Sequence, residues 1–268
     1  MNKVVVNASL VKKLRDRTGA GIMECKNALV KMEGNLEKSI DFLKTIGEIK
    51  AEKRSFHGTK QGKIFLKVEN KKAAILELNC ETDFVAKEKS FLLFGRKVVN
   101  EILLKETNDV NHINSIFQKE IKEMISKVGE NIKIYRIHFL IGKNIISYMH
   151  HNNTIGVILN IISDESTFSK NLAMHIAASK PKYLSPNIIP EMIINREKKI
   201  FLNSLKKINK SNEIINKIIQ GKINKFKNEI SLTGQNFIFE PKKTVSQLLK
   251  SYNSQVISFV RFEVGEIL

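Results

Sequence analysis

The chain has 268 residues and is 42% hydrophobic, with only 4 prolines and 13 glycines, which is typical of a folded protein of two or three compact units. No apolar run is long enough to span a membrane or to serve as a signal peptide, so we expect a cytoplasmic protein. The formal net charge is +18, but 38 of the 45 basic residues are lysines spread along the chain without interleaved aromatic residues, which argues against a specific nucleic-acid surface.

Residues 1–50 predict a small module of three helices. The apolar stripe of the first helix ends at Gly19, where glycine suits a helix C-cap, and the second helix ends at Gly34. The third helix begins after the N-cap Asn35 and is expected to end at Gly47. Helices of this size bury little surface, which favours a UBA-like module that binds another protein.

Residues 51–62 are polar and lack periodicity, which predicts a linker. Alternating apolar residues then predict two strands joined by a turn at residues 70–72, with a helix after residue 90. This β-β-α pattern defines an N-subdomain over residues 63–134.

Four residues, Thr82, Asp83, Phe84 and Val85, lie at the junction between the second strand and that helix. One interpretation is structural: Thr82 caps a short helix, Asp83 favours the positive end of its dipole, and Phe84 belongs to the core. The alternative is that Asp83 and Phe84 contact a partner.

The chain continues with a second β-β-α pattern and a pair of helices. The strands are expected at residues 135–140, 145–150 and 156–162, and the helix at 166–179. Residues 135–186 and 229–268 then form a C-subdomain, and residues 187–228 form an inserted antiparallel helical hairpin around a polar break at 209–211. We therefore predict an α+β fold in which two antiparallel sheets are each covered by a helix.

The sequence contains no complete catalytic, nucleotide-binding or metal-binding motif. Gly58–Lys63 is one residue too short for a phosphate-binding loop, and Ile64 stands where such a loop needs a serine or threonine. The two cysteines, Cys25 and Cys80, are far apart, and the histidines lack metal-ligand spacing. We expect no cofactor, no metal and no enzymatic activity.

Several phrases resemble the elongation factor Ts family. They are SLVKKLRDRTGAGIMECKNAL near the start, TDFVAK at 82–87, Gly-Glu-Asn at 129–131, MHIAASKP at 174–181, SLTGQNF at 231–237 and RFEVGE at 261–266. The resemblance covers the whole chain. It implies a guanine nucleotide exchange factor that binds EF-Tu in its GDP-bound and nucleotide-free forms and promotes GDP release during translation elongation.

The resemblance also implies site residues. Thr82–Val85 would disturb the Mg²⁺ site of EF-Tu, and Arg15, Ile22 and Met23 of the N-terminal module would dock on the GTPase domain. Gly129 and His150 would be further contacts, although His151 and an apparent insertion leave open which histidine reaches the partner. Family members often continue past the final Val-Gly-Glu with another helix that contacts EF-Tu, and we expect that contact to be missing.

Two questions stay open at this stage. The helical hairpin could mediate self-association, which would change the stoichiometry with EF-Tu. The alternative function is that of a basic, ribosome- or RNA-associated structural protein whose N-terminal module recruits another protein.

Overall fold

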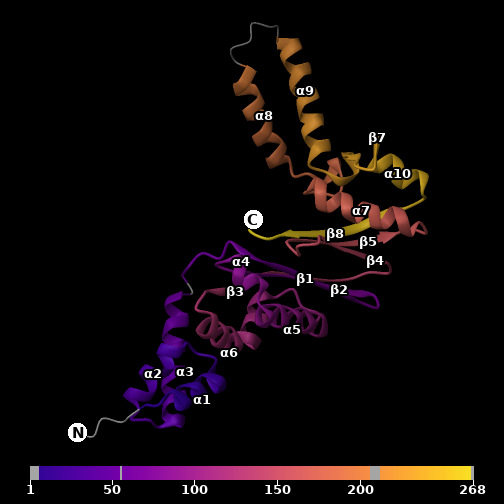
Figure 1. Ribbon diagram of the computed structural model, residues 1–268. Helices are drawn as coiled ribbons and strands as arrows, with labels where there is room; N and C mark the ends of the chain where they lie inside the picture. The colour runs from indigo at the N-terminus through magenta and orange to yellow at the C-terminus, as the bar shows by residue number, and fades with distance from the viewer. Residues whose placement is uncertain (1–5, 55, 206–211, 267–268) are drawn as a thin grey trace. The chain divides into compact units, whose positions relative to one another are not determined.

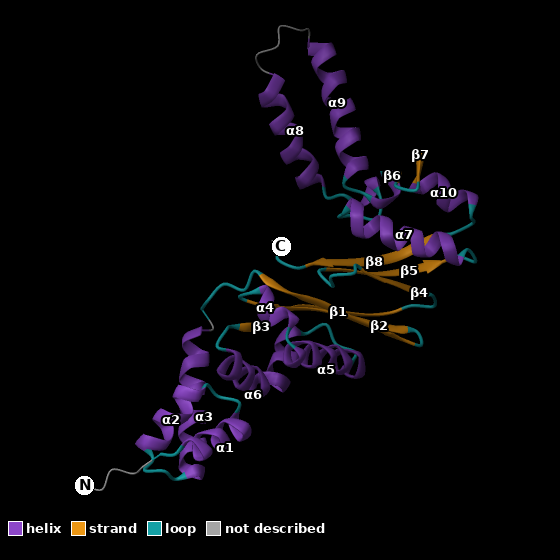
Figure 2. Ribbon diagram, in the orientation of Figure 1, coloured by secondary structure: helices purple, strands orange, loops and turns teal. Residues whose placement is uncertain are grey.

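The computed structural model describes residues 6–54, 56–205 and 212–266. Helices and short sheets follow one another along the chain (Figures 1 and 2), so the predicted α+β class is confirmed. The chain divides into two compact units. Of the described residues, the first unit comprises those up to Lys67, Ala74–Phe139 and 263–266, and the second comprises Val68–Ala73 and those between Leu140 and Phe262.

The three predicted helices open the first unit. The Asn7 side chain caps the first helix by accepting the backbone N–H of Leu10 at 2.8 Å, and Gly19 ends it with a left-handed backbone at φ 70°. The likeness to UBA domains stays a prediction. The helices are α1 (Ala8–Thr18), α2 (Ile22–Lys31) and α3 (Leu36–Arg54), and their fully buried core is Leu14, Cys25, Ala28 and Leu29.

The third helix is longer than predicted. It passes through Gly47 and continues to Arg54, so it covers the first four residues of the predicted linker. Gly47 is buried where α3 packs on helix α6 (Val110–Val128), and a β-carbon at residue 47 would lie 2.2 Å from Oγ of Ser126. The prediction that Gly47 ends the helix is therefore wrong, because this glycine is required for close packing between helices.

The first sheet has the strand order β1-β2-β3, and helices cover one of its faces (Figure 2). The first two strands form the predicted hairpin, whose two-residue turn has Asn70 at φ 55°. Phe91, Val98 and Ile102 fill the core between sheet and helices and are fully buried. The elements are β1 (Gln61–Glu69), β2 (Lys72–Cys80), β3 (Ile132–Ile141), α4 (Asp83–Lys87), α5 (Lys89–Lys105) and α6.

Strand β3 belongs to a different sheet from the one predicted. The sequence pattern places residues 135–140 with the second β-β-α unit, but β3 pairs beside β2. Ile132, Ile134 and Phe139 are buried in the first core as a result. A strand alternates with period two whichever sheet it joins, so the pattern could not identify its neighbour.

The second sheet has the order β4-β5-β8, and its first two strands are antiparallel, with Tyr148 opposite Val157. Helix α7 packs on this sheet and shares with it a core that includes Leu159, Phe168 and Leu172. The elements are β4 (Ile145–Met149), β5 (Ile155–Ile162), α7 (Ser166–Ser179), η1 (Pro186–Ile188), η2 (Leu232–Gly234), β6 (Asn236–Phe237), β7 (Glu240–Thr244), α10 (Val245–Ser251) and β8 (Gln255–Glu263).

Two helices of the second unit lie side by side, α8 (Glu191–Leu205) and α9 (Asn212–Glu229). Ile219 and Ile223 of α9 are buried against Ile194 and Phe201 of α8, which matches the predicted hairpin. The polar break predicted at 209–211 lies outside the described residues. Among the helices that the structure describes, none has the length and apolar character needed to cross a membrane.

Candidate functional site

The residues at the end of β2 present one aromatic side chain to solvent. Val85 and Ala86 of the short helix α4 are buried in the first core, at 6% and 2% exposure. Their burial turns the neighbouring Phe84 outward, and this side chain is 78% exposed. The interpretation of Phe84 as a core residue is therefore wrong, whereas Val85 belongs to the core.

Asp83 carries a negative charge beside Phe84 at neutral pH. Its Oδ2 accepts a hydrogen bond from Nζ of Lys87 at 2.5 Å, one helical turn later. This bond lowers the pKa of the Asp83 carboxyl. Both side chains are more than half exposed, so the pair remains accessible.

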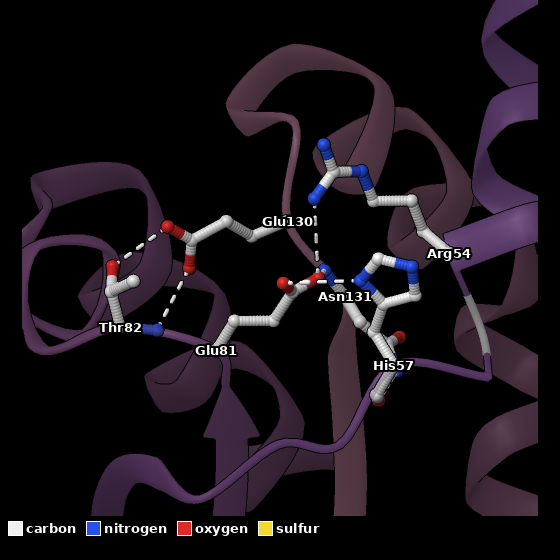
Figure 3. Close-up of polar contacts among 6 residues, drawn as sticks. All are labelled: Arg54, His57, Glu81, Thr82, Glu130 and Asn131. Carbon is white, nitrogen blue, oxygen red and sulfur yellow. Dashed lines mark hydrogen bonds and ion pairs between the residues drawn. The ribbon is translucent and has the colours of Figure 1, made fainter.

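Thr82 is held by a residue 48 positions away (Figure 3). Its backbone N–H donates to Oε2 of Glu130 at 3.0 Å, and its hydroxyl donates to Oε1 of the same carboxylate at 2.7 Å. Thr82 is the N-cap residue of α4, but its side chain makes no capping hydrogen bond. The expectation that Thr82 caps the helix through its side chain is thus replaced by a bond to a distant acid.

Glu81 makes the matching contact in the opposite direction. Its Oε1 accepts the backbone N–H of Asn131 at 2.7 Å, and the Asn131 side chain donates to the carbonyl oxygen of His57 at 2.8 Å. Arg54 Nη1 lies 3.4 Å from Glu81 Oε1, and His57 Nδ1 lies 3.4 Å from Oε2 (Figure 3). Burial alone would raise the pKa of Glu81, but these partners outweigh it and the pKa is lowered.

Cys80 is the last residue of β2 and lies just before this junction. Its thiol is fully buried and donates to the backbone carbonyl of Thr82 at 3.1 Å. Burial and the nearby carboxylate of Glu130 raise the pKa of the thiol to about 12, so it stays protonated. Cys80 is a free cysteine of the first core.

Gly129 lies next to the same junction, at the end of α6. Its φ of 75° is a left-handed conformation that suits glycine, and a β-carbon built there meets nothing within 4 Å. The glycine is thus constrained by its backbone and not by crowding. It brings Glu130 and Asn131 to the end of β2.

The other residues expected to bind a partner lie elsewhere. Arg15 is exposed on α1, while Ile22 and Met23 begin α2 with 55% and 62% of their side chains exposed. Met23 is therefore not a core residue. These three positions do not belong to the junction around Thr82.

His150 follows β4 in the second unit. The hydroxyl of Tyr148 lies 3.2 Å from His150 Nδ1, and the ring of His151 lies 4.6 Å from that of His150. His150 is half-buried and His151 exposed. Which of the two meets a partner stays a prediction.

The site is supported by four residues that the sequence did not identify as part of it: Glu81, Glu130, Arg54 and His57. The Gly-Glu-Asn turn was noticed as a motif, yet nothing in the linear sequence connects Glu130 with Thr82. In the described ranges, no group of three or more histidine, cysteine, aspartate and glutamate side chains could hold a metal ion. The junction exposes the ring of Phe84 and the carboxylate of Asp83.

Comparisons with known proteins give one consistent result. The family model described as "Elongation factor TS" matches residues 81–266. A protein named elongation factor Ts from Buchnera aphidicola subsp. Acyrthosiphon pisum (strain 5A) is 45% identical over 266 residues, which cover 99% of both chains. Its namesake from Photorhabdus laumondii is 43% identical over 263 residues, which cover 97% of this chain and 93% of the relative.

Proposed function

Because this chain belongs to the elongation factor Ts family, we propose that its Thr82–Val85 segment promotes release of GDP from EF-Tu by disturbing the Mg²⁺ and phosphate site. The chain functions as a translation elongation factor of this family. EF-Tu is the partner that the family implies. Exchange of this kind needs binding and no covalent step, because a partner that prefers the nucleotide-free conformation must weaken nucleotide binding by the same coupling free energy.

One observation carries the proposal: Phe84 is 78% exposed on a helix whose next two residues are buried. An exposed ring on so short a helix would be mobile if its backbone were unsupported. Here Val85 and Ala86 anchor the helix in the core, and Glu130 holds Thr82. The ring can therefore enter a partner without the cost of ordering a loop.

Asp83 supplies the electrostatic part of the proposed action. A GTPase holds its nucleotide through backbone donors around the phosphates and through a bound Mg²⁺. Asp83 is ionised at neutral pH, as an ordinary aspartate is, and Lys87 lowers its pKa further. A carboxylate brought to that site competes with the phosphates for Mg²⁺ and for the surrounding donors, while Phe84 displaces neighbouring side chains.

Further contacts complete the proposed interface. The exposed Ile22 and Met23 on α2, with Arg15 on α1, form a second binding surface in the N-terminal helices. Gly129 and His150 are the remaining expected contacts. Two further elements of the proposal are binding to GDP-bound EF-Tu and self-association through α8 and α9.

The substitution Phe84→Ala tests the proposal. The variant should unfold at nearly the parental temperature, because the side chain is mostly outside the core, yet release GDP from EF-Tu more slowly. The defect should shrink when EDTA removes Mg²⁺. Phe239→Ala is the matched control, since Phe239 is 50% exposed in the other unit. Parental GDP release by Phe84→Ala, or a defect unaffected by Mg²⁺, would contradict the proposal.

A second experiment separates exchange from the RNA-associated alternative. An exchange factor should co-purify with EF-Tu and be released by excess GDP and Mg²⁺. A protein bound to RNA through its lysines should instead be released by salt, since counterion release makes such binding strongly salt-dependent.

A further inference from the structure

We propose that Glu130 and Glu81 are positioning residues that fix the direction of Phe84 through two reciprocal bridges between carboxylates and backbone. The inference rests on the proposed function, because it assigns these residues to the action of Thr82–Val85. It adds residues that contact the segment from behind and do not themselves need to touch EF-Tu.

The bridges are reciprocal in a strict geometric sense. Each acid binds the backbone N–H of the residue that follows the other acid: Glu130 binds Thr82 at 3.0 Å, and Glu81 binds Asn131 at 2.7 Å. Two chain segments about fifty residues apart are thus joined by a closed ring of main-chain and side-chain bonds (Figure 3). Hydrogen bonds that involve a charged acceptor are stronger than neutral ones, which makes such a ring stiff.

Glu130 controls the orientation of α4 because it holds both donors of Thr82. The bond to the N–H fixes the backbone at the residue before the helix, and the bond to the hydroxyl fixes the side-chain rotamer. Phe84 follows two residues later on a five-residue helix. A rotation at Thr82 would therefore carry over directly to the ring of Phe84.

Glu81 connects this junction to the N-terminal helices. Its carboxylate lies 3.4 Å from both Arg54 Nη1 at the end of α3 and His57 Nδ1 just after it. The Asn131 side chain adds a bond to the carbonyl of His57. The segment that follows the N-terminal module is thus fixed at the base of the segment that carries Phe84.

The two substitutions Glu130→Ala and Glu130→Gln separate positioning from charge. Alanine removes both bonds to Thr82. Glutamine can keep both, because its carbonyl accepts the N–H while the threonine hydroxyl rotates to accept from the amide. We expect Glu130→Ala to slow GDP release about tenfold, the scale of one hydrogen bond to a charged group, and Glu130→Gln to restore most of the rate.

A double-substitution cycle with Phe84→Ala gives the decisive readout. If Glu130 acts by positioning Phe84, Glu130→Ala should cause little further loss of exchange once Phe84 is alanine. A merely structural contribution would instead lower exchange by the same factor in both backgrounds. Amide hydrogen exchange at Thr82 should rise in Glu130→Ala and stay low in Glu130→Gln.

The control is Glu120→Ala, which removes a glutamate of α6 that pairs with Lys97 at 2.7 Å on the surface, and should leave GDP release at the parental rate. Slow release by Phe84→Ala together with parental release by a folded Glu130→Ala would overturn the inference and leave the proposed function intact. Parental release by Phe84→Ala would instead contradict the proposed function. Equal defects in Glu130→Ala and Glu130→Gln would also overturn the positioning role.

Discussion

The ring of Phe65 on β1 lies directly against the backbone of Gly95 in α5. A β-carbon at residue 95 would stand 2.2 Å from Cζ of Phe65, closer than real side chains approach. The ring also meets Phe91 at 6.3 Å between centroids, one helical turn earlier. The helix that follows α4 is therefore seated on the sheet at a fixed depth.

The first prediction is that Gly95→Ala destabilises the protein although it improves helix propensity. Alanine in a helix interior is favoured over glycine by about 1 kcal/mol, but overpacking a core costs about 1–3 kcal/mol. Denaturant unfolding should show a net loss. Gly221→Ala is the control: Gly221 lies in α9 with open space around it, so that substitution should stabilise. A stabilised Gly95→Ala would show that the ring of Phe65 moves aside easily.

The second prediction concerns the charge of Asp83. Asp83→Asn keeps the shape of the side chain and removes its charge, and we expect slower GDP release with little change in thermal unfolding. The stability should hold because the ion pair with Lys87 is exposed and screened by solvent. Asp41→Asn, which breaks a similarly exposed pair with Lys44 on α3, should change neither property. Equal exchange by Asp83→Asn and the parent would assign the action to Phe84 alone.

The third prediction concerns the N-terminal helices. Met23→Ser should weaken binding to EF-Tu while the protein unfolds almost as the parent does, since the side chain is 62% exposed. Leu29→Ala provides the contrast. Leu29 is fully buried in the same helix, and its truncation should cost about 2–5 kcal/mol of stability. Titration calorimetry and urea unfolding would separate the two effects, and undiminished binding by Met23→Ser would remove this surface from the interface.

The fourth prediction concerns pH and the buried His175. Its Nε2 lies 3.0 Å from Oε1 of Gln235, whose amide nitrogen donates to the carbonyl oxygens of Ser179 and Glu229. The oxygen of Gln235 must therefore accept, so His175 carries its proton on Nε2. Burial lowers the pKa of His175 in the folded protein.

A lowered pKa means that the unfolded state binds more protons at His175 than the folded state does as the pH falls below about 6.5. Stability should therefore decrease with falling pH, by up to about 1.4 kcal/mol per pH unit from this group. The ordinary pKa of histidine is about 6.5, so urea unfolding at about pH 7.5 and about pH 5.5 measures how steeply the free energy of unfolding depends on pH. His175→Gln should reduce this pH dependence of stability. An unchanged pH dependence would assign it to His138, because burial lowers the pKa of that residue too.

Much of the local structure could be predicted because short-range physics determines it. Gly19 ends the first helix as expected, and the hairpin turn at Asn70 lies between the two predicted strands. The motif TDFVAK identified the segment around Phe84. It could not show that Phe84 is exposed, because a strand-to-helix junction allows the ring to point either way.

The tertiary structure decided the features that depend on distant partners. Gly47 is a helix end by its local preference, yet α3 continues through it, and the contact with Ser126 on another helix explains why the residue is a glycine. The partner of β3 and the bond between Thr82 and Glu130 follow the same principle. Interactions within a few residues of chain determine helix caps and turns. Tertiary packing determines strand neighbours, close helix contacts and bridging carboxylates, because these depend on which surfaces meet after the chain has collapsed.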